Sequence, residues 1–186
     1  ALAQTGIRPE ELDMIVVSTM SPDAVLPCTA CEVQKAIGAE GAVCFDLQAA
    51  CTGFIFAYNT AQAYIQSNMC RTVLLIGSER LSRLVDWTDR GTCILFGDGA
   101  GAAVLKAAEG RAYLPVSHSD GKKGEALTCD RYIHMDGRAV FQFAVTRVPE
   151  VIREVLTKNE LLMDDVDYFV LHQANRRIVE AVAKRL

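Results

Sequence analysis

Cys51 and His172 are the residues of this 186-residue chain whose types and positions best suit nucleophilic chemistry. Cys51 follows a short strand and small residues (FDLQAAC) and comes directly before TGFIFAYNTAQAYI, which predicts a helix. A thiol at a helix N-terminus faces the positive end of the helix dipole and free backbone N–H groups, which favour the nucleophilic thiolate. The same N–H groups suit an oxyanion on a bound thioester. From the local sequence alone, a buried structural cysteine is the favoured alternative.

His172 has the most defined position of the three histidines. It ends the predicted strand DYFVL and precedes Gln-Ala-Asn and a helix. In α/β folds, reactive groups gather at the carboxyl ends of strands. Taken alone, a histidine there is more often hydrogen-bonded structure than catalyst, but its place in the repeat described below favours catalysis. His118, in a polar stretch, and His134, in a turn, are interpreted as surface or structural residues.

The seven cysteines do not form a disulfide pattern. Their number is odd, their spacing is irregular and most lie among apolar neighbours, so we expect reduced thiols and a cytoplasmic protein. Cys28 and Cys31 form a C-x-x-C pair, but no second pair follows and no histidine lies at a zinc-ligand spacing. A structural role is therefore favoured over a redox or zinc site, and no metal is expected.

Two further segments contain residues that suit ligand binding. Arg90 lies in the polar segment DWTDRGT, where its guanidinium suits a phosphate or a flat base. The alternative is a surface arginine with Asp86 and Asp89 as partners. The run GDGAGA, residues 97–102, formally fits G-x-G-x-x-A, but the residues after it are too few for the helix that a dinucleotide site requires. We therefore interpret this run as a tight turn between two strands.

The composition excludes several classes of protein. Hydrophobic residues make up 51% of the chain and charged residues 23%, which is typical of a globular domain. The net charge of −4 does not attract the negatively charged backbone of a nucleic acid. No apolar run reaches the roughly 18 residues that a membrane span needs. We therefore expect neither nucleic acid nor a membrane as a partner.

Apolar strands alternate with helical segments, which predicts an α/β fold with a sheet covered on both faces. Pro149 is expected to kink or split the long helix that contains it. The predicted strands are residues 14–19, 42–45, 72–77, 92–96, 102–105 and 168–171. The predicted helices are residues 29–37, 52–67, 138–158 and 176–186.

An internal repeat bears on the domain organisation. IRPEELDMIVV, residues 7–17, and LLMDDVDYFVL, residues 161–171, share the same order of apolar and acidic residues when Leu12 is aligned with Val166. Ser18 is then the counterpart of His172. The repeat predicts two related halves, residues 1–110 and 111–186, and a parent molecule of roughly 300 residues. Because the second copy stops early and the first starts on a helix end, we expect this chain to lack both ends of its parent.

Four motifs in order resemble β-ketoacyl-acyl-carrier-protein synthase III over essentially the whole chain. They are AACTGF around Cys51, TDRGT around Arg90, FGDGAGAAVL, and LHQANRRI around His172. The resemblance implies a thiolase-like, five-layer αβαβα fold with two duplicated halves, and a homodimer. It also implies an acyltransferase that condenses a short acyl-CoA primer, such as acetyl-CoA, with malonyl-acyl carrier protein to initiate fatty acid biosynthesis. The CoA thioester is then a substrate, and no cofactor is implied.

The resemblance further assigns roles to individual residues. Cys51 would take the acyl group from CoA as a thioester, and His172 would hydrogen-bond the malonyl thioester oxygen. The positions that match substrate contacts are Arg90 (CoA adenine), Asn175 (pantetheine arm), Gly137 and Phe141 (acyl-pocket wall) and Leu26 (acyl pocket of the partner subunit). Arg177 matches a basic docking position for the acidic carrier protein.

The chain departs from the family pattern at one catalytic residue. The family's third catalytic residue, an Asn in a Gly-Asn-Thr-Ser motif, does not occur between His172 and Leu186. We therefore expect the 186 residues alone not to complete the reaction. Two alternatives stay open: another thiolase-fold condensing enzyme, of polyketide or quinolone type, and an inactive fragment that dimerises or binds the carrier protein.

Overall fold

The computed structural model describes all residues from Ala1 to Leu186. They form two compact units. The first comprises Ala1–Arg83 and Gly97–Arg111, and the second comprises Leu84–Phe96 and Ala112–Leu186. The segment 84–96 thus belongs to the second unit, although in chain order it interrupts the first.

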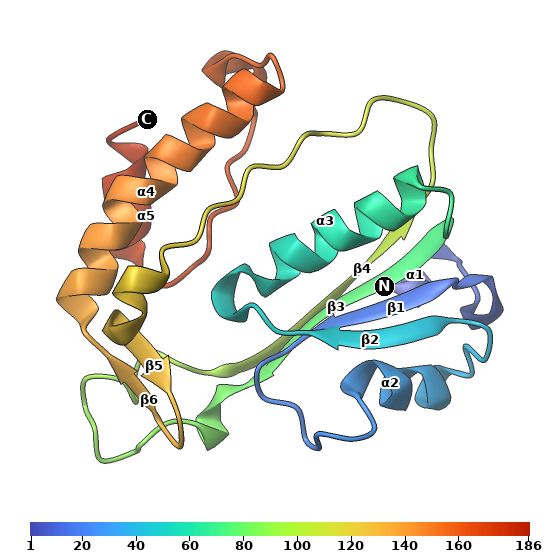
Figure 1. Cartoon of the computed structure of the whole chain (residues 1–186), viewed down its shortest axis with the longest axis horizontal. Coiled ribbons are helices and arrows are strands. Elements are labelled where there is room, and N and C mark those ends of the chain that lie inside the picture. The colour runs from blue at the N-terminus through green and yellow to red at the C-terminus, as the bar shows by residue number, and fades with distance from the viewer. The chain divides into compact units, whose positions relative to one another are not determined.

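A four-stranded sheet in the order β2–β1–β3–β4 forms the centre of the first unit (Figure 1). β1 (Met14–Ser18) lies between β2 (Val43–Leu47) and β3 (Thr72–Arg80) and pairs with both in parallel. β4 (Asp98–Lys106) pairs with β3 in the antiparallel direction. All of β1 is buried, which explains its continuous apolar run.

Helices cover opposite faces of this sheet (Figure 1). The face with Ile15 and Val17 packs against α2 (Thr29–Ile37), and the face with Met14 packs against α3 (Gly53–Gln66). This alternation follows the two-residue period of a strand. The short helix α1 (Leu2–Thr5) precedes β1.

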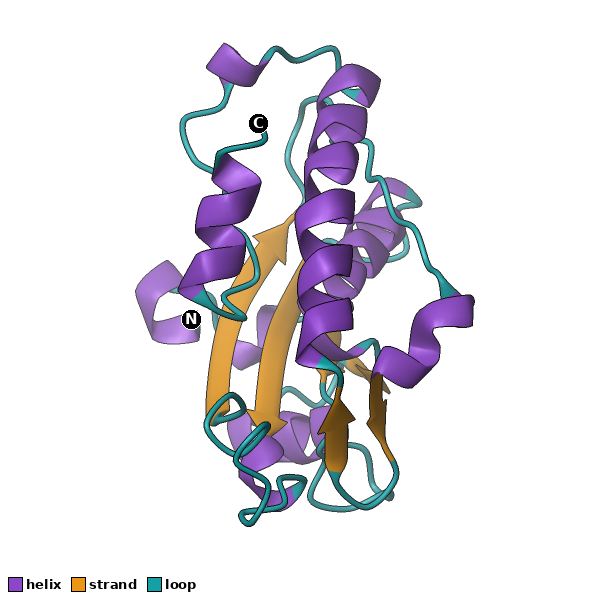
Figure 2. Ribbon diagram, turned by 90° about the vertical axis from the view of Figure 1, so that its left-hand side faces the viewer, coloured by secondary structure: helices purple, strands orange, loops and turns teal.

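The second unit is built mainly on two helices, α4 (Gly137–Lys158) and α5 (Arg176–Ala183). A short hairpin of β5 (Leu127–Cys129) and β6 (Ile133–Met135) leads directly into α4 (Figure 2). The two helices share one apolar cluster, whose buried members are Ile152, Leu156, Ile178 and Val182. The predicted apolar side of the last helix is therefore its packed face.

The α/β class and the four predicted helices are confirmed, and the helix predicted at residues 29–37 has those same bounds. The strand predicted at residues 92–96 is wrong. This segment is a series of turns in which Asp89 accepts hydrogen bonds at both its backbone and its side chain. Its carbonyl accepts from the N–H of Cys93 (3.0 Å), and its carboxylate accepts from the N–H of Gly91 (2.8 Å) and the hydroxyl of Thr92 (2.7 Å). These local bonds hold the backbone out of a sheet ladder.

The tight turn predicted at residues 97–102 is also wrong, because most of this run is strand. β4 starts at Asp98, and its glycines continue the ladder, with Gly101 opposite Gly77 and Gly99 opposite Glu79. A Cβ atom added at Gly99 or Gly101 would meet no atom within 4 Å. Close backbone approach therefore does not explain these glycines, although the rejection of a dinucleotide site stands, since no helix follows the run.

The strand predicted at residues 168–171 does not form. The segment pairs with no other strand, and Tyr168 and Val170 are 86% and 90% exposed. An apolar run such as this one becomes a strand only where a neighbouring strand supplies hydrogen-bond partners.

The two segments of the predicted repeat share a backbone conformation just before their apolar stretches. In the first, the N–H of Arg8 donates to the Glu11 carboxylate (3.1 Å) across the 3₁₀ turn Pro9–Glu11. In the second, the N–H of Leu162 donates to the Asp165 carboxylate (2.7 Å) across the 3₁₀ turn Met163–Asp165. The acids of the repeat therefore cap equivalent turns, which is their local physical role.

Pro149 does not split α4, which continues over 22 residues (Figure 1). Because proline has no N–H, the carbonyl of Val145, four residues earlier, loses its helical donor. The guanidinium of Arg185, beyond the end of α5, donates to this carbonyl. Of the kink or split expected from the sequence, the split does not occur, and the compensating partner is distant in sequence.

We predict that Arg185→Ala lowers the free energy of unfolding by about 1–2 kcal/mol, because it leaves a buried carbonyl without a donor. Urea denaturation followed by circular dichroism measures this loss. In a Pro149→Ala background the helix regains its own N–H donor, so the same Arg185→Ala change should cost less. An equal cost in both backgrounds would contradict the assignment.

Candidate active site

Cys51 lies at the junction between the sheet and helix α3. It is the middle residue of the 3₁₀ turn Ala50–Thr52, which follows β2 and leads directly into Gly53. The preceding residue, Ala50, has a φ of 43°, a left-handed conformation that L-residues with a side chain rarely adopt. Such strain is typical of functional turns, and it places an exposed cysteine at the start of a helix.

Gly53 makes the close approach of this helix start to β1 possible. A Cβ atom added at Gly53 would lie 2.0 Å from the hydroxyl oxygen and 3.2 Å from the Cβ of Ser18, the buried last residue of β1. No side chain fits in that gap, so only glycine allows α3 to start here. The path of the chain through Cys51 therefore depends on this contact.

The surroundings of Cys51 do not favour its thiolate. Burial by the surrounding protein atoms raises the pKa of the Cys51 thiol, although part of the residue is open to solvent. A hydrogen bond from its own backbone N–H lowers that pKa, and the negative charge of Glu79 raises it further. The expectation of a thiolate favoured by the helix terminus is thus not met within this chain, because desolvation and Glu79 act in the opposite direction.

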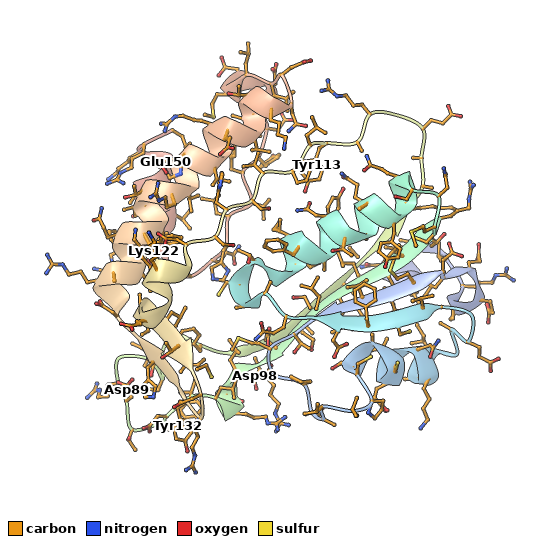
Figure 3. The ribbon with its side chains drawn as sticks, in the orientation of Figure 1. Asp89, Asp98, Tyr113, Lys122, Tyr132 and Glu150 are labelled. Carbon is orange, nitrogen blue, oxygen red and sulfur yellow. The ribbon has the colours of Figure 1, made fainter.

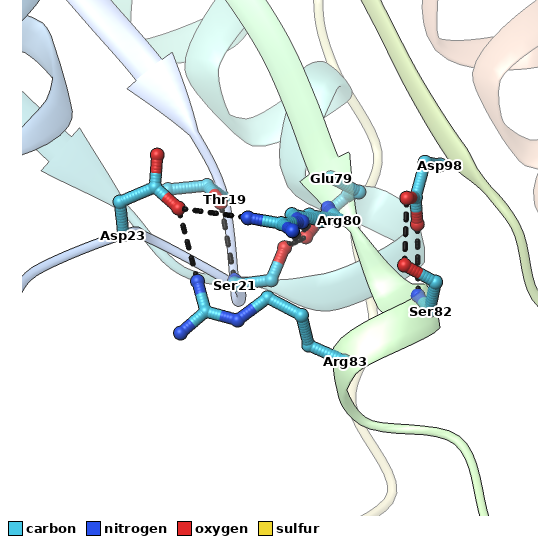
Figure 4. A network of polar contacts seen from close by, with 8 residues as sticks. All are labelled: Thr19, Ser21, Asp23, Glu79, Arg80, Ser82, Arg83 and Asp98. Carbon is cyan, nitrogen blue, oxygen red and sulfur yellow. Dashed lines mark hydrogen bonds and ion pairs between the residues drawn. The ribbon is translucent and has the colours of Figure 1, made fainter.

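Glu79 also anchors the loop that follows β1 (Figure 4). Its carboxylate accepts hydrogen bonds from the N–H of Met20 (3.0 Å) and the hydroxyl of Ser21 (2.5 Å). The Ser21 oxygen in turn accepts from the N–H of Arg80 (2.7 Å). Sequence reasoning missed Glu79, because no local motif marks a single acid at a strand end.

Leu26 lies further along this anchored loop. Its side chain is 83% exposed, and that of the neighbouring Val25 is 89% exposed. Nothing within the chain covers these apolar groups. They are therefore accessible, as the predicted role of Leu26 at a partner subunit requires.

His172 belongs to the second unit and lies in a stretch without helix or strand. The residue is exposed, and no hydrogen bond or ion pair holds its ring. Three residues later, Asn175 caps α5, its side-chain oxygen accepting a hydrogen bond from the N–H of Ile178 (3.0 Å). Because the side-chain oxygen of Asn175 is occupied, its amide nitrogen is the atom that remains for the expected ligand contact.

Arg177 and its neighbour Arg176 differ in their partners. Arg176 forms an ion pair with Glu180 one turn along α5 (2.5 Å), whereas Arg177 is exposed and has no ion pair. A cation at a helix N-terminus gains nothing from the helix dipole. Arg177 is therefore free to meet an acidic surface.

Arg90 is exposed in the segment 84–96. Its neighbour Asp89, labelled in Figure 3, belongs to the same segment. Both neighbouring acids, Asp86 and Asp89, accept hydrogen bonds from other residues. Asp86 accepts hydrogen bonds from the N–H and hydroxyl of Thr88 (2.8 and 2.7 Å), and Asp89 accepts from Thr92 and Gly91. The hydroxyl hydrogen bond from Thr92 lowers the pKa of Asp89, and that from Thr88 lowers the pKa of Asp86. Arg90 therefore lies at the surface, as the alternative predicted, but no ion pair joins it to Asp86 or Asp89.

Gly137 and Phe141 lie in the first turns of α4. Gly137 is the first residue of the helix, next to its cap Asp136, whose carboxylate accepts from the N–H of Arg138 and Ala139 (3.0 Å each). Phe141 is half-buried against the α4–α5 cluster. Its ring is thus part of the packing of the second unit.

The predicted site residues divide between the two units. Cys51 and Leu26 belong to the first. Those of the second unit are Arg90, Gly137, Phe141, His172, Asn175 and Arg177. Nowhere in the chain do His, Cys, Asp and Glu side chains gather in a way that suits a metal ion. None of the helices combines the length and apolar character that crossing a membrane requires.

Comparisons with known proteins bear on this geometry. A model of the family 3-oxoacyl-[acyl-carrier-protein (ACP)] synthase III matches residues 45–121, and a model of the same family's C-terminal part matches residues 156–186. The beta-ketoacyl-[acyl-carrier-protein] synthase III of Clostridium novyi is 44% identical over 202 residues, and that of Bacillus cereus is 47% identical over 188 residues. Each alignment includes 100% of this chain, but only 62% and 61% of the relative.

Solved structures agree with these matches. The chain superimposes on the 3-oxoacyl-[acyl-carrier-protein] synthase III of Aquifex aeolicus with a TM-score of 0.95 and 44% identity, covering 100% of this chain and 61% of that one. The priming beta-ketosynthase of the R1128 polyketide pathway gives a TM-score of 0.95 at 36% identity, covering 100% and 60%. The chain belongs to the 3-oxoacyl-[acyl-carrier-protein] synthase III family and has its thiolase-like fold.

We predict that Gly53→Ala lowers the free energy of unfolding by about 2 kcal/mol, because the new methyl group overlaps the Ser18 hydroxyl. Ser18→Ala removes that oxygen, so the double variant should regain most of the loss. Chemical denaturation of the wild type, both single variants and the double variant measures the coupling. Strictly additive effects would show that the contact is not the cause.

We predict that Glu79→Gln lowers the pKa of Cys51, because removal of a negative charge stabilises the thiolate. Glutamine keeps an oxygen that accepts the hydrogen bonds of the loop. The rate of Cys51 alkylation, followed against pH by peptide mass spectrometry, should reach its half-maximum at a lower pH than in the wild type. The exposed Glu40→Gln serves as the control, and an unchanged profile in Glu79→Gln would exclude the electrostatic effect.

Proposed function

We propose that the protein to which these residues belong performs the initiating condensation of fatty acid biosynthesis. A short acyl-CoA, most simply acetyl-CoA, and malonyl-acyl carrier protein react by decarboxylative Claisen chemistry to give 3-ketoacyl-acyl carrier protein. The observation that carries the proposal is the match to synthase III relatives along the whole chain, at 44–47% identity. It includes the exposed Cys51 at a helix start.

The reaction starts with acyl transfer to Cys51. The thiolate attacks the carbonyl carbon of the acyl-CoA, the carbon–sulfur bond to CoA breaks, and CoA leaves as a thiol after taking up a proton. Two-step transfer through a cysteine lets one thiolate serve as both acceptor and leaving group. Because its surroundings raise the pKa of Cys51, the thiol form is favoured before the reaction. The proton that this thiol gives up balances the one that the departing CoA sulfur takes up.

The condensation step uses the second substrate. Malonyl-acyl carrier protein loses carbon dioxide, and the resulting enolate carbon attacks the acyl carbon on Cys51, whose thiolate then leaves. We assign His172 as the donor of a hydrogen bond to the thioester oxygen on which the enolate charge develops. Its exposed ring without a partner supports this role. The third family residue, an Asn, is not among these 186 residues.

The remaining residues are proposed to bind the substrates. Arg90, whose neighbouring acids are engaged elsewhere, packs on the CoA adenine, and Asn175 contacts the pantetheine arm. Gly137 and Phe141 line the acyl pocket. Arg177, a cation without an ion pair, meets the acidic carrier protein. Exposed Leu26 reaches the acyl pocket of a second subunit in a cytoplasmic homodimer, and no cofactor takes part.

A second candidate is a priming ketosynthase of a polyketide pathway. The 36% identity to the R1128 priming beta-ketosynthase supports it, but the more similar relatives carry synthase III names. The two functions differ in the primer that labels Cys51 and in the carrier protein that accepts the extended chain. A panel of acyl-CoA primers and both kinds of carrier protein distinguishes them.

We predict that incubation with acetyl-CoA adds one acetyl group to the protein, because Cys51 is the acyl acceptor. Intact-mass spectrometry detects the adduct, and peptide mapping locates it. Cys51→Ser should abolish the adduct, whereas Cys129→Ser, which removes another exposed cysteine, should retain it. An acetyl group on any other cysteine, or none at all, would refute the assignment of Cys51.

A further inference from the structure

Cys28 and Cys31 lie together at the N-terminal end of α2, outside the chemistry proposed above. Their sulfur atoms are 3.4 Å apart and share a hydrogen bond, but no disulfide joins them. Cys28 is the cap of the helix, and Cys31 is the third residue of its first turn. Both side chains are half-buried rather than enclosed, so small molecules can reach them.

The backbone already holds these two residues at a separation that suits a disulfide. The N–H groups of Cys31 and Glu32 donate to the carbonyl of Cys28 (3.0 and 3.2 Å), which closes the first helical turn. Residues three apart in such a turn have Cα atoms about 5 Å apart, within the range of disulfides. The sulfur atoms need to approach from 3.4 Å to about 2 Å. Side-chain rotation provides this movement without unwinding the helix.

We propose that Cys28 and Cys31 form a reversible disulfide by exchange with small-molecule disulfides such as oxidised glutathione. The Cys28 thiolate attacks one glutathione sulfur, a new sulfur–sulfur bond forms, and reduced glutathione leaves. The Cys31 sulfur, after losing its proton, attacks the Cys28 sulfur and expels the second glutathione. Two protein thiols are thereby oxidised and one oxidised glutathione is reduced to two thiols.

The groups around the pair favour one order of attack. The Asp46 carboxylate accepts from the N–H groups of Thr29 and Ala30 (2.8 Å each) at the helix start. The hydrogen bond with Cys28 raises the pKa of Cys31, and burial, the charge of Cys28 and Asp46 raise it further. Loss of the Cys31 proton is therefore disfavoured, which makes Cys31 the second thiol to react. In this order the mixed disulfide with glutathione forms on Cys28, and Cys31 then closes the bond within the protein.

A third thiol near this pair makes the proposal specific. Cys44 on β2 lies close enough to interact with Cys31, but burial raises the pKa of Cys44 to about 11. Its thiol also donates a hydrogen bond to the carbonyl of Ala42 (3.5 Å). Cys44 is therefore a poor attacking group, and the disulfide joins Cys28 to Cys31 rather than Cys31 to Cys44.

The test is a titration of the reduced protein with mixtures of reduced and oxidised glutathione. Free thiols are blocked by alkylation, and peptide mapping then locates any disulfide. We expect one Cys28–Cys31 disulfide in the wild type and in the control variant Cys129→Ser. Cys31→Ser should trap one glutathione on Cys28. Cys28→Ser should form no disulfide, and because serine is a good helix cap this variant should fold.

The same titration in denaturant shows whether the folded helix end favours the disulfide, or whether the short separation of the two cysteines in sequence is enough. Since the helix end holds the two residues together, the equilibrium constant for disulfide formation should be about tenfold higher in the folded protein. Free Cys28 and Cys31 after oxidation, a Cys31–Cys44 disulfide, or equal constants with and without denaturant would each overturn the proposal. The readout does not depend on acyl transfer.

Discussion

The contact between Ser18 and Gly53 is the constraint on which the first unit depends. β1 runs buried through the centre of the sheet, and its last residue meets the first residue of α3 where no Cβ atom fits. Further along α3, Ala57 and Ala61 are also buried, one and two helical turns from Gly53. Small side chains on this face let the helix axis lie close to the sheet.

That close packing determines where Cys51 lies. With α3 held against β1 by its small residues, the chain leaving β2 has only a short path to reach the helix start. Ala50 takes a left-handed conformation within this path, and Cys51 follows it. The position of Cys51 is therefore a consequence of backbone packing, while burial and the charge of Glu79 raise its pKa. Geometry favours this cysteine as a nucleophile even though the nearby charge does not.

The main architecture was predictable because it follows from periodicity. Buried runs such as residues 14–18 and the helix at 29–37 have local signals that packing reinforces. The predictions were wrong where a hydrogen-bond partner is distant in sequence, or where a side chain competes with the backbone for hydrogen bonds. Asp89 turns a predicted strand into successive turns, and Arg185 supplies the donor that Pro149 removes from α4. Neither pairing can be deduced from a local pattern.

The candidate site shows the same division. Cys51 and His172 stood out because each follows an apolar segment and precedes a helix, which is a local signal. Glu79 acts on Cys51 from another strand, and the partner of Gly53 is distant in sequence. Sequence therefore indicated which residues have suitable chemistry, whereas the contacts that set their positions and pKa values required the structure.

The repeat places two different residues, Ser18 and His172, at equivalent positions. Gly6 and Glu160 have similar left-handed φ values of 70° and 59°, and equivalent capped turns follow them. The copies diverge at the end of their apolar segments. There the first copy places Ser18 under α3, buried against Gly53, whereas the second places an exposed imidazole, His172. A serine that α3 covers cannot reach a substrate, so only the second copy leaves this position open for chemistry.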